Sequence, residues 1–146
     1  MATKKSETSA EKKKIEAAKE RGKQSLHNIY DECISHQRAL DFYKQELKYL
    51  QKRLADIVKR NTNSEILALA EQFQNQFIVT KENLDELGQT IKAQLKAVEK
   101  HIKLKPTHLE EKTIDLSSSF SQSIHNLEKD FAGMKLRFNK FLAKYL

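Results

Sequence analysis

The chain has 146 residues, of which 32% are charged and 38% are hydrophobic, and its formal net charge is +7. This length suits a single domain, and the chain holds only three glycines and one proline. So few turn-forming residues exclude β-sandwich and α/β folds, which need many tight turns. The composition therefore predicts an all-α protein built from a few long helices.

The N-terminal 21 residues form the most basic segment and contain few large apolar side chains. Residues 1–21 are predicted to be a Lys-rich tail, disordered or frayed-helical, beside a folded domain at residues 22–146. The cations available to contact nucleic-acid phosphates are Lys4, Lys5, Lys12, Lys13, Lys14, Lys19, Arg21 and Lys23. Because glutamates are interspersed and no aromatic ring is present for base stacking, a solubilising tail is favoured over nucleic-acid binding, which remains the alternative.

Three segments, predicted at about residues 22–60, 63–104 and 108–145, show the periodicity of amphipathic helices. Their inward side chains recur every three or four residues, so each helix presents one apolar seam. In the first segment the seam holds Leu26, Ile29, Cys33, His36, Leu40, Tyr43, Leu47, Leu50, Leu54 and Ile57.

Two polar breaks separate these segments. Thr62 followed by Glu65, and Thr107 followed by Glu110, have the spacing of a capping box. Pro106 disfavours helix at the residue before it. Because both breaks are short, consecutive helices must run antiparallel. The predicted fold is an up-down-up bundle of three long helices with heptad-like, coiled-coil packing and a flexible basic tail.

Folding the chain at the two breaks places the three seams in layers. Phe73 and Phe138 are expected beside Leu50, and Phe120 is expected beside Cys33. Three seams that match over their whole length support the predicted bundle.

Polar side chains near the seams are candidates for chemistry. His36 is interpreted as a hydrogen-bonded interior histidine rather than a metal ligand or a proton relay. Thr80 is expected to form a hydrogen bond with Tyr43 that helps to fix the register of the helices. His101 and His108 flank the second break, where polar surface is favoured over a metal site.

Sequence motifs for catalysis are missing. The chain contains no Glu-x-x-His pattern of di-iron bundles, no glycine-rich phosphate loop and no nucleophile elbow. Cys33, the single cysteine, lies on the inner seam and is interpreted as a small buried hydrophobe. We therefore expect a protein that is not an enzyme and uses no metal or cofactor.

Apolar runs long enough to cross a membrane are missing as well, and the N-terminus lacks the apolar core of a secretory signal. One cysteine cannot form an intramolecular disulfide. These features predict a cytoplasmic protein without membrane contact.

Ile34, Phe42 and Tyr49 are apolar or aromatic residues of the first helix that lie outside its seam. Phe42 and Tyr49 are separated by one heptad, which places them on one stripe of the helix. Scattered surface apolar residues are ordinary, but an aromatic stripe on a long helix suggests a binding surface. The predicted function is a structural or protein-interaction bundle that binds a partner, or a second copy, through this outer face.

Three stretches carry a resemblance to other proteins: FYKQELKYLQKRL, FQNQFIVTKENLDEL and LRFNKFLAKYL. From about Leu26 onward the chain resembles a group of small bacterial helical proteins. The resemblance implies a helical bundle and brings no activity, substrate or site. The predicted architecture is also similar to spectrin-type three-helix repeats, which implies nothing about function.

Overall fold

The computed structural model describes the backbone of residues 2–104 and 111–146 and the side chains of residues 9–17, 26–103 and 118–146. Its helices are α1 (Ala2–Arg60), α2 (Ser64–Leu104) and α3 (Glu111–Tyr145). Strands are absent from the described residues, so the predicted all-α class is confirmed. None of the described helices combines the length and the apolar character that a membrane span requires.

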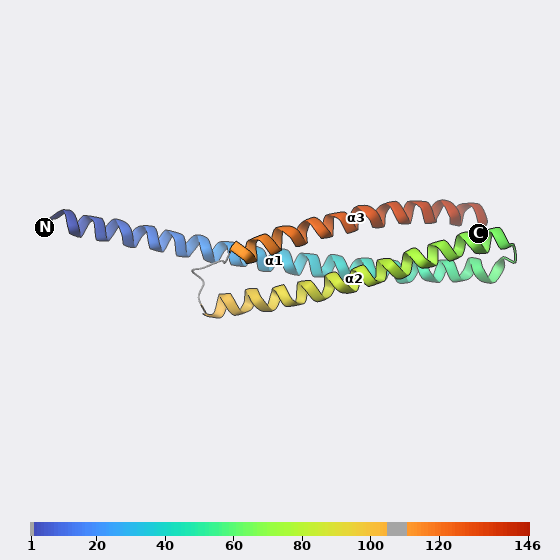
Figure 1. Ribbon diagram of the computed structural model, residues 1–146, viewed down its shortest axis with the longest axis horizontal. Helices are drawn as coiled ribbons and strands as arrows, with labels where there is room; N and C mark the ends of the chain where they lie inside the picture. The colour runs from blue at the N-terminus through green and yellow to red at the C-terminus, as the bar shows by residue number, and fades with distance from the viewer. Residues whose placement is uncertain (1, 105–110) are drawn as a thin grey trace.

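The helices lie along one another rather than crossing steeply (Figure 1). A short turn at residues 61–63 leads from α1 into α2, which returns alongside α1. Helix α3 contacts both of them. The contact between α1 and α2 is more extensive than the contact of α3 with either helix. The backbones of α1 and α2 therefore lie closer to each other than either lies to the backbone of α3.

Helix α1 is longer than predicted. It begins at Ala2 rather than near residue 22, and of the two predicted states of the tail, disordered or frayed-helical, residues 2–21 adopt the helical one. The segment contains alanines and alternating Glu and Lys but no proline, and a single Gly22 costs a helix only about 1 kcal/mol relative to alanine. Nothing in this stretch ends the helix, and the N-terminal part of α1 projects beyond α2 and α3 (Figure 1).

The cap of α2 is Asn63. Its Oδ1 accepts hydrogen bonds from the backbone N–H of Glu65 at 2.8 Å and of Ile66 at 3.4 Å. The predicted capping box of Thr62 with Glu65 is therefore wrong by one residue. Asparagine caps helices at least as well as threonine, and Asn63 directly precedes the first helical residue. The second predicted capping pair, at residues 107 and 110, lies outside the described residues.

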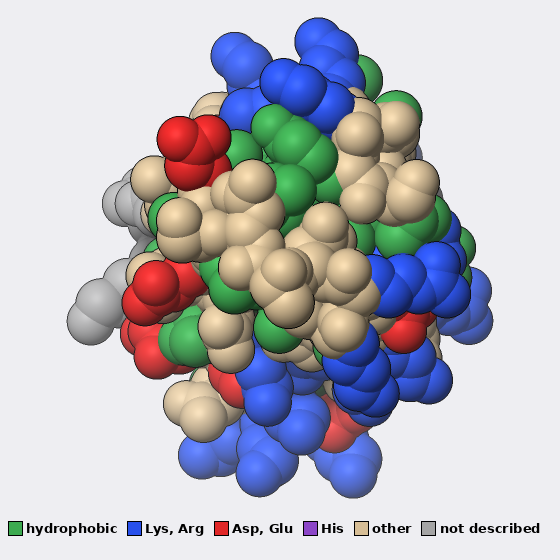
Figure 2. All heavy atoms as spheres, turned by 90° about the vertical axis from the view of Figure 1, so that its right-hand side faces the viewer, with side chains coloured by type: hydrophobic (Ala, Val, Ile, Leu, Met, Phe, Trp, Pro, Cys, Tyr) green, Lys and Arg blue, Asp and Glu red, His purple; other side chains and the backbone are tan. Residues whose placement is uncertain are grey.

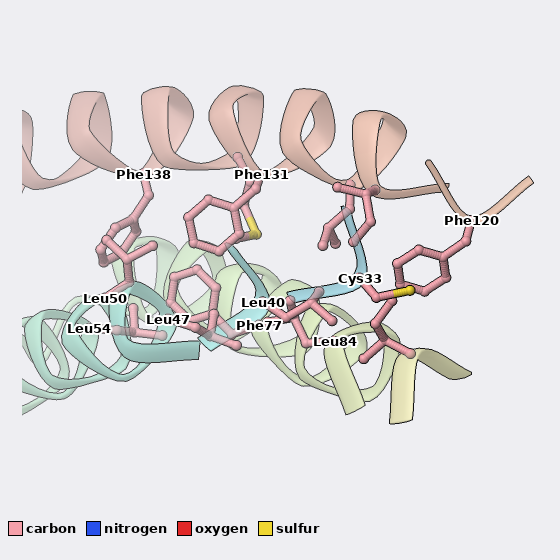
Figure 3. Packing of buried hydrophobic residues seen from close by; sticks show 14 of the residues in the cluster. Cys33, Leu40, Leu47, Leu50, Leu54, Phe77, Leu84, Phe120, Phe131 and Phe138 are labelled. Carbon is pink, nitrogen blue, oxygen red and sulfur yellow. The ribbon is translucent and has the colours of Figure 1, made fainter. Parts of the chain in front are cut away.

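The core forms from the predicted seams, and α3 contributes aromatic rings to it (Figure 3). The ring of Phe138 lies 5.2 Å from that of Phe73 and 5.1 Å from that of Phe77, and it points toward Leu50 of α1. This contact agrees with the predicted layer. Near the other end of the described core, the ring of Phe120 lies beside Cys33. The described part of α3 thus meets α1 and α2 through rings that fill the space between the backbones.

His36 and Thr80 are polar residues at the edges of this core. The Nε2 atom of His36 lies 3.3 Å from Oγ of Ser121 in α3, and its ring lies 5.5 Å from that of Phe120. This geometry agrees with a hydrogen-bonded histidine. Thr80 differs from the prediction, because its hydroxyl donates to the carbonyl of Gln76 at 2.8 Å instead of bonding to Tyr43. A threonine hydroxyl within a helix readily reaches the carbonyl one turn earlier.

Candidate interaction surfaces

The outer stripe of α1, formed by Phe42 and Tyr49, is strongly exposed. Phe42 is 58% exposed and Tyr49 is 59% exposed. Glu46 lies between them, one turn from each, and its Oε2 accepts a hydrogen bond of 2.7 Å from Nζ of Lys135 in α3. The outer stripe therefore borders the contact between α1 and α3.

A half-buried ring beside the core, that of Tyr43, supports the outer stripe. Phe42 packs edge-on against Tyr43 at 5.4 Å between ring centroids, and Tyr43 in turn lies 4.8 Å from Phe131 of α3. Burial, Glu128 and Glu46 together raise the pKa of Tyr43, so its hydroxyl stays protonated over the physiological range. Phe42 therefore packs against a ring that is itself packed against α3.

Ile34 does not belong to the same stripe. It is half-buried, and its position on α1 is rotated by about 80° from that of Phe42. The structure brings Phe42 and Tyr49 onto one face and leaves Ile34 beside it.

The projecting part of α1 carries cations of the N-terminal segment. Lys12, Lys13 and Lys14 are exposed. Because successive helical residues are about 100° apart, these three lysines spread around the helix instead of forming one basic face. The side chains of Lys4, Lys5, Lys19, Arg21 and Lys23 lie outside the described residues.

Lys and Arg side chains are also prominent at the opposite end of the molecule, where hydrophobic side chains lie among them (Figure 2). Lys59 and Arg60 occupy the last turn of α1, and Lys144 occupies the last turn of α3. Cations in these positions interact favourably with the negative end of the helix dipole. Part of this basic surface therefore has a structural explanation.

The histidines and the cysteine were the sequence's candidates for metal binding and nucleophilic chemistry. Within it, no group of three or more His, Cys, Asp or Glu side chains is placed to hold a metal ion. His101 is half-buried, and His108 lies outside the described residues. Burial and, to a lesser degree, the charge of Glu32 raise the pKa of the Cys33 thiol to about 11. An activated cysteine nucleophile has the opposite shift.

A groove between α1 and α2 was not predicted from the sequence. Three hollows line up along this helix pair, and every residue that lines them belongs to α1 or α2. The signal in the sequence was a set of lysines beside the heptad leucines, such as Lys44 and Lys48 near Leu47. These lysines form only one wall of the groove. The other wall belongs to α2, whose residues are far away in the sequence, so the groove becomes visible only in the folded structure.

Comparisons with known proteins found no relative of this chain. The chain matches no protein-family model, and neither the curated proteins nor the solved structures include a significant match. The proposals below therefore rest on the residues and their geometry.

Proposed function

We propose that the chain is a non-enzymatic interaction module, an up-down-up bundle of three helices whose outer stripe binds a second copy or a helix of another protein. The observation that carries this proposal is the exposure of Phe42 and Tyr49 on one face of α1. Leu136 of α3, which is 59% exposed, follows the lysine that bonds to Glu46. Exposed aromatic side chains on a rigid support are typical anchors of protein interfaces.

The stripe is also well organised for binding. Phe42 packs against Tyr43, and the ion pair between Glu46 and Lys135 links α1 to α3 between the two aromatic residues. A partner that covers these rings removes apolar surface from water at about 25 cal/mol per Å². Little conformational entropy is lost, because the long helix is already ordered. Ile34 is not included, because it lies on another face of α1.

Light scattering over a concentration series, with the wild-type chain and Phe42→Glu, tests this proposal. We expect the wild type to self-associate, or to retain a specific partner in a pull-down, and Phe42→Glu to lose that association because a charge replaces an apolar anchor. Val79→Glu is a matched control, since Val79 is 55% exposed on α2. A monomeric wild type that retains no partner would sink the proposal.

The projecting N-terminal part of α1 favours one alternative function, binding to nucleic acid through its lysines. Lys12, Lys13 and Lys14 are exposed on a segment that extends beyond the other helices. Their replacement by glutamate is expected to abolish salt-sensitive retardation of duplex DNA, because phosphate contacts release counterions. Equal retardation by the wild type and the triple variant would exclude this alternative.

A further inference from the structure

The three hollows between α1 and α2 form one groove, here named the α1–α2 groove. Their volumes are about 400, 510 and 280 Å³. Gln51 lines both the first and the second hollow, while Asp41, Lys44 and Asp85 line both the second and the third. Neighbouring hollows therefore share walls and form one row along the helix pair, and the ion pair between Lys44 and Asp85 crosses this row between the second and the third hollow.

The floor of the α1–α2 groove repeats with the heptad. Leu54, Leu47 and Leu40 line the first, second and third hollow in turn. These leucines are already buried, with Leu40 and Leu47 each 2% exposed and Leu54 5% exposed, so they form the base of the groove and a further helix would make its apolar contacts mainly at the walls. On α1 the lining extends from Gln37 to Lys59, a length of about 33 Å at 1.5 Å per residue. A helix of about 20 residues fits this length.

One end of the groove is markedly apolar. The first hollow is lined by Val58 of α1 and Ile78 of α2, and also by the buried residues Leu54 and Phe77. Val58 is 46% exposed and Ile78 is 47% exposed, whereas Phe77 is buried. This hollow therefore offers a site for a large apolar side chain that enters between the two helices.

The rim of the α1–α2 groove is basic. Its charged residues are Lys44, Lys48, Lys59, Lys81, Lys92, Asp41 and Asp85. Lys44 and Asp85 face each other across the groove at 3.5 Å. The remaining charges are mostly positive, so a partner with acidic residues beside its apolar stripe is favoured. A second copy is disfavoured, because the whole chain has a net charge of +7.

We propose that the α1–α2 groove binds an amphipathic helix of a partner protein in which acidic residues flank an apolar heptad stripe. This surface is separate from the outer stripe, since Phe42 and Tyr49 line none of the three hollows. The apolar stripe lies above the buried leucine floor, and one large side chain enters the hollow between Val58 and Ile78, which are both half-exposed. The acidic flanks face the lysines and replace Asp85 as the partner of Lys44.

Two synthetic peptides test the proposal on the full-length chain. Both have three heptads with leucine at positions a and d; one has glutamate at positions e and g, and the other has lysine there. Like charges keep each peptide from pairing with itself. Fluorescence anisotropy with labelled peptide is expected to show at least tenfold tighter binding of the acidic peptide. Equal affinities, or no binding of the acidic peptide, would overturn the proposal.

Three variants locate the binding site. Ile78→Glu is expected to weaken acidic-peptide binding at least tenfold. Val79→Glu, the matched control, introduces the same charge one residue along, in a hollow between α2 and α3, and should leave the affinity unchanged. Phe42→Glu should also leave it unchanged, which separates this groove from the outer stripe. Equal losses in Ile78→Glu and Val79→Glu, or a loss in Phe42→Glu, would contradict the assignment.

Two further outcomes would assign the groove to another occupant and overturn the proposal. One is self-association of the wild type, measured by light scattering, that Ile78→Glu abolishes and Phe42→Glu preserves. The other is a competition result. It would be found if a duplex DNA oligonucleotide displaced the acidic peptide equally well from the wild type and from the triple variant in which Lys12, Lys13 and Lys14 are changed to glutamate.

Discussion

The α1–α2 pair has two long faces, and different side chains border them. On the face toward α3, the rings of Phe138, Phe131 and Phe120 are buried against the pair. On the face of the α1–α2 groove, lysines and glutamines stand at the edges and the hollows reach the leucine floor. Rings complete a core because they fill space and exclude water, whereas lysine stems lie along the groove above a leucine floor that is already buried and keep their charged ends in water.

The same leucines of α1 lie in the core and also line the α1–α2 groove. Leu47 is 2% exposed and Leu54 is 5% exposed, yet each contributes an edge to the groove. The difference between the faces therefore comes from the flanking residues rather than from the seam. A fourth helix with apolar residues would meet a floor that is already ordered.

The largest effect is expected from truncating a ring on the covered face. Phe138 is fully buried and touches Phe73 and Phe77. Phe138→Ala is expected to lower the free energy of unfolding by about 3–5 kcal/mol, because it removes buried apolar surface and leaves a cavity. Urea unfolding followed by circular dichroism measures this change.

The matched substitution on the groove face is Ile78→Ala. Ile78 is 47% exposed, and its loss is expected to cost less than about 1 kcal/mol because half of the side chain is already in water. Similar losses for Phe138→Ala and Ile78→Ala would show that the two faces do not differ in packing as described.

The next effect concerns the thiol that lies beside Phe120. Because the pKa of Cys33 is raised from 9.0 to about 11, the thiolate fraction at pH 8 falls about a hundredfold. Reaction with a disulfide reagent such as DTNB is therefore expected to be at least about a hundredfold slower in the folded chain than in urea. Equal rates would mean that the thiol is exposed.

The same shift makes stability depend on alkaline pH. The folded chain holds the Cys33 proton more tightly than the unfolded chain, so this contribution is complete below pH 9 and is lost as the pH rises through about 11. Tyr43, whose pKa is also raised, acts in the same direction. The Cys33→Ala variant is the control: between pH 8 and pH 10.5 it should lose less unfolding free energy than the wild type.

A small gain in stability is expected from a substitution on the groove side. Gly88 lies in the interior of α2 and lines the third hollow. A Cβ atom there would lie 3.6 Å from Nζ of Lys44, which is an ordinary contact. Gly88→Ala is therefore expected to raise the free energy of unfolding by about 1 kcal/mol through helix propensity alone.

Gly133 provides the control for this substitution. Its Cβ would lie 3.3 Å from Nη1 of Arg137, a closer contact that obliges the arginine to move, so Gly133→Ala should gain less than Gly88→Ala. Thermal unfolding of both variants measures the difference. A loss of stability in Gly88→Ala would mean that the groove is tighter at this point than its hollow indicates.

Much of the fold was accessible from the sequence. The helical class follows from the scarcity of glycine and proline, and the seams were identified because inward residues repeat every three or four positions. Boundaries were harder to place. The cap of α2 was predicted at Thr62 but is Asn63, because both residue types suit the position. Helix α1 continues through Gly22, because one glycine does not end a helix.

Some features of the candidate surfaces could be predicted from the sequence and others could not. The exposure of Phe42 and Tyr49 follows from their distance from the seam of α1, which is a local property. The hydroxyl of Thr80 bonds within its own helix instead of to Tyr43, and periodicity does not report that choice. The α1–α2 groove needs residues from two helices at once, and no stretch of the sequence contains both of its sides.

The sequence by itself determined the helical class of this protein and the inward face of each helix, because composition and period act within one segment. Tertiary structure decided which side of the α1–α2 pair the rings of α3 cover and which side shows a basic groove. The physical reason is that a groove depends on the distance and rotation between two helices. Those quantities are set by the packing of side chains that lie far apart along the chain.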